Sequence, residues 1–167
     1  VGHPTEADRA LKMETAYAGR SWLFQSREKN QIEYRIASSL VNAFSDPTKM
    51  GFGHYTYDAE GTPVRPVTVI KNGILKSFLN GRETAAILEQ EPNGSMRATT
   101  SSMVPLVRMT NTIFGPGRKN PGNIIREVKN GYYIVRHRIP SISESRENFR
   151  ISAQKVYKIE NGKLVKL

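Results

Sequence analysis

Apolar and polar residues alternate along much of this chain, and such alternation is typical of β-strands that bury one face. Three runs in the second half predict strands over 105–115, 132–139 and 149–159. An earlier run predicts a strand over 34–44, followed by a loop rich in turn-forming residues. The pattern therefore predicts a chain dominated by strands.

Two Asn-Gly pairs lie between apolar runs and predict β-hairpins with type I′ turns. Asn72-Gly73 lies inside the segment 62–79, and Asn161-Gly162 lies near the end of the chain. Both central residues of a type I′ turn have a positive φ, which Asn and Gly tolerate best. We expect the strands on both sides of each pair to be antiparallel.

Helical spacing is confined to short segments, and it predicts helices over 4–18, 81–90 and 123–131. Pro4 suits a first helical turn, and Asn130-Gly131 predicts the end of the last helix. Residues 89–104 show no periodicity and are predicted to form a long surface loop.

The predicted fold class is α+β, with strand-rich mixed or antiparallel sheets, β-hairpins and a few short helices. No Pro/Ser-rich linker interrupts the chain, so we expect one domain over residues 1–167.

The composition narrows the function classes only slightly. The chain has no cysteine and no apolar run long enough to cross a membrane, and we expect it to be cytoplasmic with no membrane partner. Its net charge of +10 comes from 25 basic and 15 acidic residues, which would favour nucleic acid. The basic residues are spread along the chain, however, so nucleic-acid binding is the less favoured interpretation.

The residues alone point to little chemistry. There is no Gly-rich phosphate loop and no G-x-S-x-G motif. The three histidines, His3, His54 and His137, do not have metal-ligand spacing, and a lone histidine is more often structural.

The segment "VRMTNT" is the other candidate, with polar side chains at Arg108, Thr110 and Asn111. Such a row either lines a site or satisfies buried backbone groups beside the loop 89–104. On a regular strand Asn111 would face away from Arg108, so a bulge is needed for all three to share a face.

Several segments together resemble the TldD/PmbA family of zinc metallopeptidases, formerly called modulators of DNA gyrase. They are "VGHPTEADRALK", "DAEGTPVRPVTVIKNGILKSFL", "VRMTNTIF", "IIREVKNGYYI" and "KVYKIENGKL", in that order. The resemblance implies that His3 is the second histidine of the H-E-x-x-x-H metal motif of a TldD-type subunit. It places the first histidine and the catalytic glutamate before Val1, and a cysteine ligand beyond Leu167.

The resemblance thus implies a fragment of the C-terminal metallopeptidase region, truncated at both ends and inactive alone. The intact parent would use zinc to hydrolyse extended or unfolded peptides, whereas this fragment would bind none. Arg108, Thr110 and Asn111 would contribute to the peptide cleft. The resemblance also implies a homodimer, or a heterodimer with a related subunit. The alternatives are a non-catalytic partner subunit of the same family and a nucleic-acid-binding module.

Overall fold

The computed structural model describes residues 22–142 and 149–166, which fall into two compact units. The first unit contains the described residues up to Gly115, and the second contains those from Pro116 onwards. The predicted α+β class is confirmed, because antiparallel sheets dominate both units and the helices are short. The single domain over residues 1–167 stays a prediction, and the predicted helix over 4–18 lies outside the described residues.

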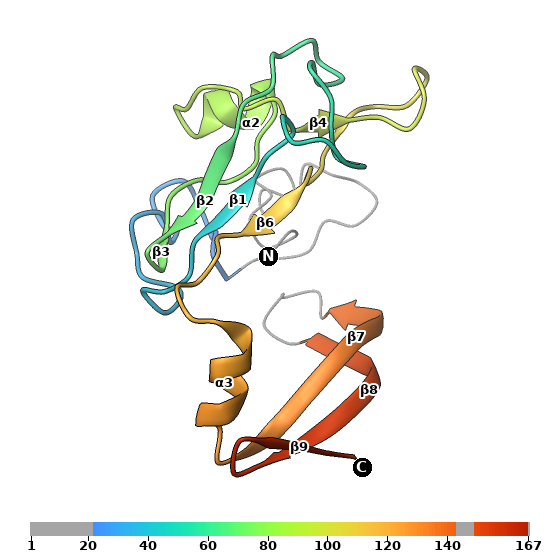
Figure 1. Ribbon diagram of the computed structural model, residues 1–167. Helices are drawn as coiled ribbons and strands as arrows, with labels where there is room; N and C mark the ends of the chain where they lie inside the picture. Colours follow the sequence, from blue (N-terminus) through green and yellow to red (C-terminus); the bar gives the residue numbers. More distant parts are fainter. Residues whose placement is uncertain (1–21, 143–148, 167) are drawn as a thin grey trace. The chain divides into compact units, whose positions relative to one another are not determined.

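The first unit is built on a four-stranded antiparallel sheet with the order β3-β2-β1-β6 (Figure 1). Its strands are β1 (Ala43–Ser45), β2 (Val67–Lys71), β3 (Ile74–Leu75) and β6 (Thr112–Phe114). The predicted hairpin joins β2 to β3, with φ values of 50° at Asn72 and 79° at Gly73. These two positive angles are those of a type I′ turn.

A short ribbon and a helix complete this unit. The ribbon pairs β4 (Met96–Arg97) with β5 (Leu106–Val107), so the predicted loop 89–104 contains a strand. The predicted helix over 81–90 is confirmed as α2 (Arg82–Ile87).

The core of the first unit forms where sheet, ribbon and the segment before β1 meet. It contains Leu23, Phe24, Ala43, Val67, Val69, Ile70, Leu75, Phe78, Leu79, Met96 and Val107. Phe24 and Phe78 pack edge to face, with ring centroids 5.5 Å apart. The core therefore joins residues that are more than eighty positions apart in sequence.

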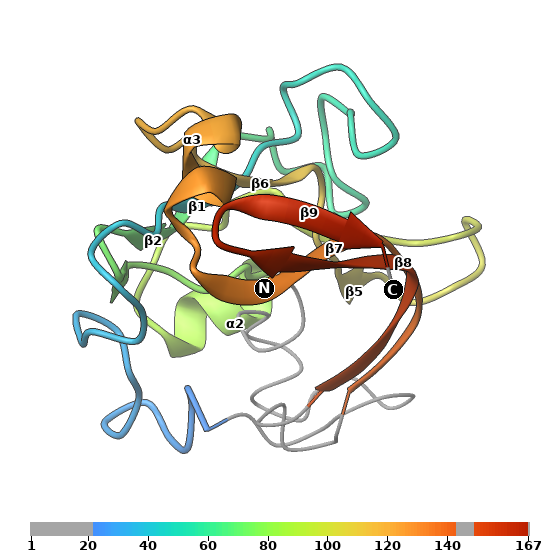
Figure 2. The same ribbon diagram turned by 60° about the horizontal axis from the view of Figure 1, so that its bottom comes forward.

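The second unit is a three-stranded antiparallel sheet with the order β7-β8-β9, beside one short helix (Figure 2). Its elements are α3 (Pro121–Glu127), β7 (Asn130–Ile142), β8 (Phe149–Glu160) and β9 (Lys163–Lys166). The hairpin predicted at Asn161-Gly162 is confirmed, with φ values of 48° and 77°. α3 packs against β9.

The strand predicted over 34–44 is wrong for most of its length, since only Ala43–Ser45 is a strand here. Instead the chain wraps around the β2–β3 turn. The N–H groups of Ile36 and Ala37 both donate to the carbonyl of Gly73, at 2.9 and 3.1 Å. The N–H groups of this segment therefore bond to the turn, instead of pairing in register with a neighbouring strand.

Two other boundaries differ from the prediction. The strand predicted over 105–115 is two strands, β5 and β6, separated by residues 108–111. The helix stop predicted at Asn130-Gly131 is also wrong. These residues open β7 opposite Glu160 and Ile159, and α3 already ends at Glu127.

Candidate functional site

Residues 108–111 connect the β4–β5 ribbon to the four-stranded sheet. The N–H of Arg108 donates to the carbonyl of Ser95 at 2.9 Å, which extends the ribbon by one pair. The carbonyl of Asn111 accepts from the N–H of Asp46 at 3.0 Å, which extends the pairing of β6 with β1. The segment therefore changes partner midway, and its side chains face two different surroundings.

The side chain of Asn111 holds the loop 46–54 that follows β1. Its Nδ2 donates to the carbonyls of Lys49 at 2.6 Å and Asp46 at 3.2 Å. Its Oδ1 accepts from the N–H of Gly53 at 3.1 Å. Both N–H donors of this amide are thus engaged by the loop backbone. This geometry supports the structural interpretation of Asn111, and its part in substrate binding stays a prediction.

Thr110 ties the same region to β1. Its Oγ1 lies 2.9 Å from Oγ of Ser45, and its N–H donates to that Oγ at 3.3 Å. Ser45 is buried, so this pair of hydroxyls satisfies polar groups beneath the loop.

Arg108 lines a cavity of about 270 Å³ together with Arg97, Thr99, Met103 and Leu106. Met96 and Val107 lie opposite each other in the ribbon and are buried, so Arg97, Leu106 and Arg108 occupy the other face. Nη1 of Arg97 donates to the carbonyl of Met109 at 2.9 Å.

Arg97 was not among the sequence candidates, because it lies in a segment predicted to be a loop. A signal existed in the alternation of Ser95, Arg97 and Thr99, which predicts a strand with these side chains on one face.

Tyr55 lies close enough to Arg97 for its phenol to be affected by that charge. Its hydroxyl donates to the carbonyl of Gly94 at 2.9 Å. Burial raises the pKa of the Tyr55 phenol to about 12, although the nearby positive charge of Arg97 opposes the rise. The phenol therefore acts as a neutral hydrogen-bond donor at physiological pH.

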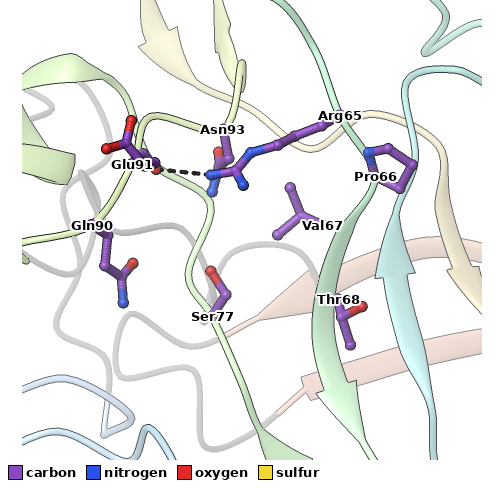
Figure 3. Close-up of a pocket in the computed structure, with 8 residues that line it drawn as sticks. All are labelled: Arg65, Pro66, Val67, Thr68, Ser77, Gln90, Glu91 and Asn93. Carbon is purple, nitrogen blue, oxygen red and sulfur yellow. Dashed lines mark hydrogen bonds between the residues drawn. The ribbon is translucent and has the colours of Figure 1, made fainter.

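A second cavity, of about 370 Å³, lies beside β2 (Figure 3). Nη2 of Arg65 reaches across it to the carbonyls of Glu91 and Pro92, at 3.2 and 3.4 Å. Asn93 at its wall is buried, and its amide is used by Asn80, Phe78 and Ser95. The polar groups of Arg65 and Asn93 are thus engaged in local contacts, and we assign this cavity no function.

Of the three histidines, only His54 has a described side chain. Its Nδ1 lies 2.9 Å from the carbonyl of Pro47. A carbonyl only accepts, so Nδ1 is the donor in this contact. His137 lies on β7 opposite Ala153, and His3 lies outside the described residues.

Among residues 22–142 and 149–166, no three His, Asp or Glu side chains are grouped so as to hold a metal ion. The described donors therefore do not by themselves fit the three-ligand site that catalytic zinc requires. The same part of the chain contains no helix that is both long and apolar enough to span a membrane.

The fold and these contacts define a strand-rich α+β module. In this module, residues 108–111 hold the loop 46–54 in place and border a cavity lined by two arginines. A family model described as the PmbA/TldA metallopeptidase C-terminal domain matches residues 7–167. The chain therefore belongs to the PmbA/TldD family.

Curated relatives match nearly the whole chain. A metalloprotease of Methanothermobacter thermautotrophicus is 34% identical over 164 residues, covering 98% of this chain and 34% of the relative. A zinc metalloprotease TldD homolog of Saccharolobus solfataricus is 33% identical over 167 residues, covering 98% of this chain and 34% of the relative. The chain thus spans about a third of the length of these relatives.

The crystal structure of TldE from Thermococcus kodakarensis has the same fold. It matches with a TM-score of 0.76 at 23% identity, covering 98% of this chain and 35% of that one. A Thermotoga maritima protein described as a candidate modulator of a DNA gyrase matches with a TM-score of 0.78 at 22% identity. It covers 99% of this chain and 35% of the Thermotoga chain.

Proposed function

We propose that this chain is part of a zinc-dependent peptidase that acts on extended or unfolded peptides. The observation that carries the proposal is the similarity to metalloproteases along 98% of the chain, one of them named a zinc metalloprotease. Because the chain spans about a third of these relatives, the rest of the parent protein would complete the active site.

In this proposal His3 is one zinc ligand, and the remaining ligands and the general base come from parts of the parent outside residues 1–167. The metal, when bound, would supply an activated water for attack on a peptide bond. The described residues would bind and orient the peptide.

The edge of β6 offers a backbone surface that suits an extended peptide. Asn111 and Gly115 both bond to the β1 side, and Ile113 lies opposite Phe44 between them. In an antiparallel pair such bonded positions alternate with positions that face outward. The N–H and C=O groups of Thr112 and Phe114 therefore point away from β1, and no described strand pairs with them. A peptide can add here as a further strand.

The test uses the intact parent protein, a fluorogenic unstructured peptide and measurement of bound zinc. We expect stoichiometric zinc, loss of cleavage on chelation and recovery on adding zinc. His3→Ala should lower both zinc content and cleavage, whereas the matched change His54→Ala should leave the zinc content unchanged. Full zinc content and full activity in His3→Ala would contradict the assignment of His3.

A non-catalytic partner subunit is the second candidate, supported by the similarity in fold to TldE over 98% of the chain. It predicts an intact protein that binds no zinc and assembles with a related, active subunit. Zinc content therefore separates the two proposals. Assembly as a homodimer or heterodimer fits either proposal and is measured by analytical ultracentrifugation. Nucleic-acid binding is less favoured, and it would appear as DNA affinity that falls steeply with salt.

A further inference from the structure

We propose that the second unit binds an acidic, extended segment of the peptide substrate along the edge of β7. The inference rests on the proposed function, because it names the class of peptide that the parent protein would cleave. The site lies in the second unit and is distinct from the β6 edge of the first unit.

The positive charge of the chain is concentrated in residues 116–167. They include 12 basic and 4 acidic residues, a net charge of +8, whereas residues 1–115 include 13 basic and 11 acidic residues, a net charge of +2. Basic residues therefore occur along the whole sequence, but their excess over acidic residues does not. These counts include every residue of the chain, so no ion pair within it can remove the excess. Such a charge attracts a polyanionic partner.

The described part of the second unit has two acidic residues, and both are already engaged in ion pairs. Glu127 pairs with Lys119, and Glu160 pairs with Lys158. Further exposed basic side chains lie on or beside the sheet, and no described acidic residue forms an ion pair with them; they are Lys129, Arg136, Arg150, Lys155 and Lys163. The excess charge is thus carried by exposed side chains around this sheet.

The edge of β7 presents backbone groups that another polypeptide can pair with. The N–H of Asn161 donates to the carbonyl of Lys129 at 2.7 Å, so position 129 bonds towards the β8 side. Bonded and outward positions alternate in an antiparallel pair, so the N–H and C=O groups of Tyr132 and Ile134 point away from β8. No described strand pairs with this edge. An extended peptide can therefore add beside β7.

The side chains at this edge favour an acidic peptide over a nucleic acid. Tyr132 and Ile134 are 65% and 63% exposed and offer apolar surface to the side chains of an added strand. Lys155 lies opposite Val135 on β8, so a cation flanks this surface. Stacking of successive bases needs several aromatic rings on one surface. Tyr132 and Tyr133 are consecutive residues of a strand, so their rings lie on opposite faces and cannot form such a platform.

The first measurement is equilibrium binding to the intact parent protein, followed by fluorescence anisotropy. Two labelled, unstructured peptides differ only in a run of Glu residues that is Gln in the second peptide, and a single-stranded oligodeoxynucleotide of equal length is the third probe. We expect the Glu peptide to bind about tenfold more tightly at low salt, and the ratio to fall as salt screens the exposed charges. Tighter binding of the oligonucleotide, with displacement of the Glu peptide, would overturn the proposal in favour of nucleic acid.

Charge reversal assigns the preference to one unit. The double variant Lys129→Glu, Lys155→Glu puts two acidic side chains near the β7 edge and should abolish the preference for the Glu peptide. The matched control is Lys29→Glu, Lys71→Glu, which changes the net charge equally at exposed lysines of the first unit and should retain the preference. Loss of the preference in both double variants, or in neither, would overturn the assignment to the second unit.

A proline substitution tests the edge itself. Ile134→Pro removes an N–H that points away from β8, and proline is tolerated at such edge positions. It should weaken the binding of both peptides and leave the melting temperature near that of the parent. If it melts at a lower temperature, Tyr132→Pro repeats the test at the other outward position. Undiminished binding would exclude the β7 edge.

Cleavage of the same two peptides by the intact protein separates this inference from the proposed function. We expect kcat/KM to show the same preference for the Glu peptide as Kd. If neither peptide is cleaved but the preference in Kd depends on Lys129 and Lys155, the peptidase proposal fails and this site stands. If both peptides are cleaved and bound equally well, the site fails and the peptidase stands.

Discussion

At the scale of single residues, the side chain of Asn111 holds the loop 46–54 in place. Its three hydrogen bonds connect positions 46, 49 and 53 of one loop to the start of β6. Met50 and Phe52 in that loop are among the most exposed apolar residues of the described chain, at 85% and 110%. The exposed part of the loop around these two residues therefore has little apolar packing of its own and depends on these polar contacts.

We expect Asn111→Ala to lower the free energy of unfolding by about 2 kcal/mol, because three backbone groups lose their partner and regain only part of their hydration. Denaturant unfolding followed by circular dichroism measures this. The control Asn123→Ala removes only a long contact to Arg126, at 3.4 Å, and should change stability little. An Asn111→Ala variant of parental stability but weaker peptide turnover would instead assign this residue to substrate binding.

Gly73 and Gly61 allow a controlled comparison of substitutions, since their φ values are almost equal, at 79° and 76°. A Cβ at Gly73 would lie 2.3 Å from the carbonyl oxygen of Ala37, whereas one at Gly61 would meet nothing within 4 Å. Gly61→Ala should cost about 1 kcal/mol from backbone strain. Gly73→Ala should cost about 2 kcal/mol or more, because the chain around the turn must also move. Equal losses in thermal unfolding would mean that the wrapped segment 36–38 yields without penalty.

Tyr55 gives a pH dependence with a defined sign. Its pKa is about 12 in the folded protein and 10.0 without the fold, so the folded state holds the proton more tightly. The associated stability is complete below pH 10 and is lost as the pH rises from about 10 through about 12. Tyr55→Phe should lose about 1 kcal/mol at neutral pH and should show a shallower decline above pH 10. Parallel stability curves for the two proteins would exclude this role.

At the scale of elements, the sequence predicted best where local chemistry decides the structure. Asn72-Gly73 and Asn161-Gly162 form the expected turns because the positive φ values belong to those residues themselves. The start of α3 followed a local signal as well. Asn120 caps the helix through its Oδ1 and Pro121 follows it, although the prediction began two residues later.

The wrong predictions share a different cause, because residues distant in sequence compete for the backbone hydrogen bonds. Nothing in the local pattern of residues 34–42 shows that the β2–β3 turn engages Ile36 and Ala37. Likewise polar and apolar residues do alternate in "VRMTNT", but the two ends of this segment bond to different partners. One end bonds to Ser95 and the other to Asp46. The sequence therefore identified the candidate residues as one group. Their separate surroundings depend on strand pairing, which only the fold shows.

The edge of β6 allows a test that separates binding from folding within one strand. Thr112→Pro removes an N–H that points away from β1, and proline is tolerated at such edge positions. We expect stability within about 1 kcal/mol of the parent and at least a tenfold loss of peptide kcat/KM in the intact protein, because one bond to the added strand is gone. Ile113→Pro is the matched change on the β1 side, and it should destabilise the sheet. Unchanged turnover in Thr112→Pro would exclude this edge as the peptide site.

At the scale of the whole molecule, the described residues form a scaffold with a candidate peptide edge in the first unit. They do not include a group of three metal-ligating side chains. The sequence adds no cysteine, and its first histidine is the family-implied ligand His3. Catalytic zinc needs three protein ligands, so a chain that supplies one of them should hold the metal only weakly.

We therefore expect the 167-residue chain, produced alone, to show no zinc-dependent rise in its unfolding temperature. Binding at a zinc concentration one hundred times Kd would add about 2.7 kcal/mol of stability, which thermal unfolding readily detects. The intact parent protein should show such a rise, and it should lose the rise in His3→Ala. If the isolated chain binds one zinc ion and is stabilised to this extent, residues within 1–167 would complete a site. The ligands of the peptidase would then have to be sought inside this chain.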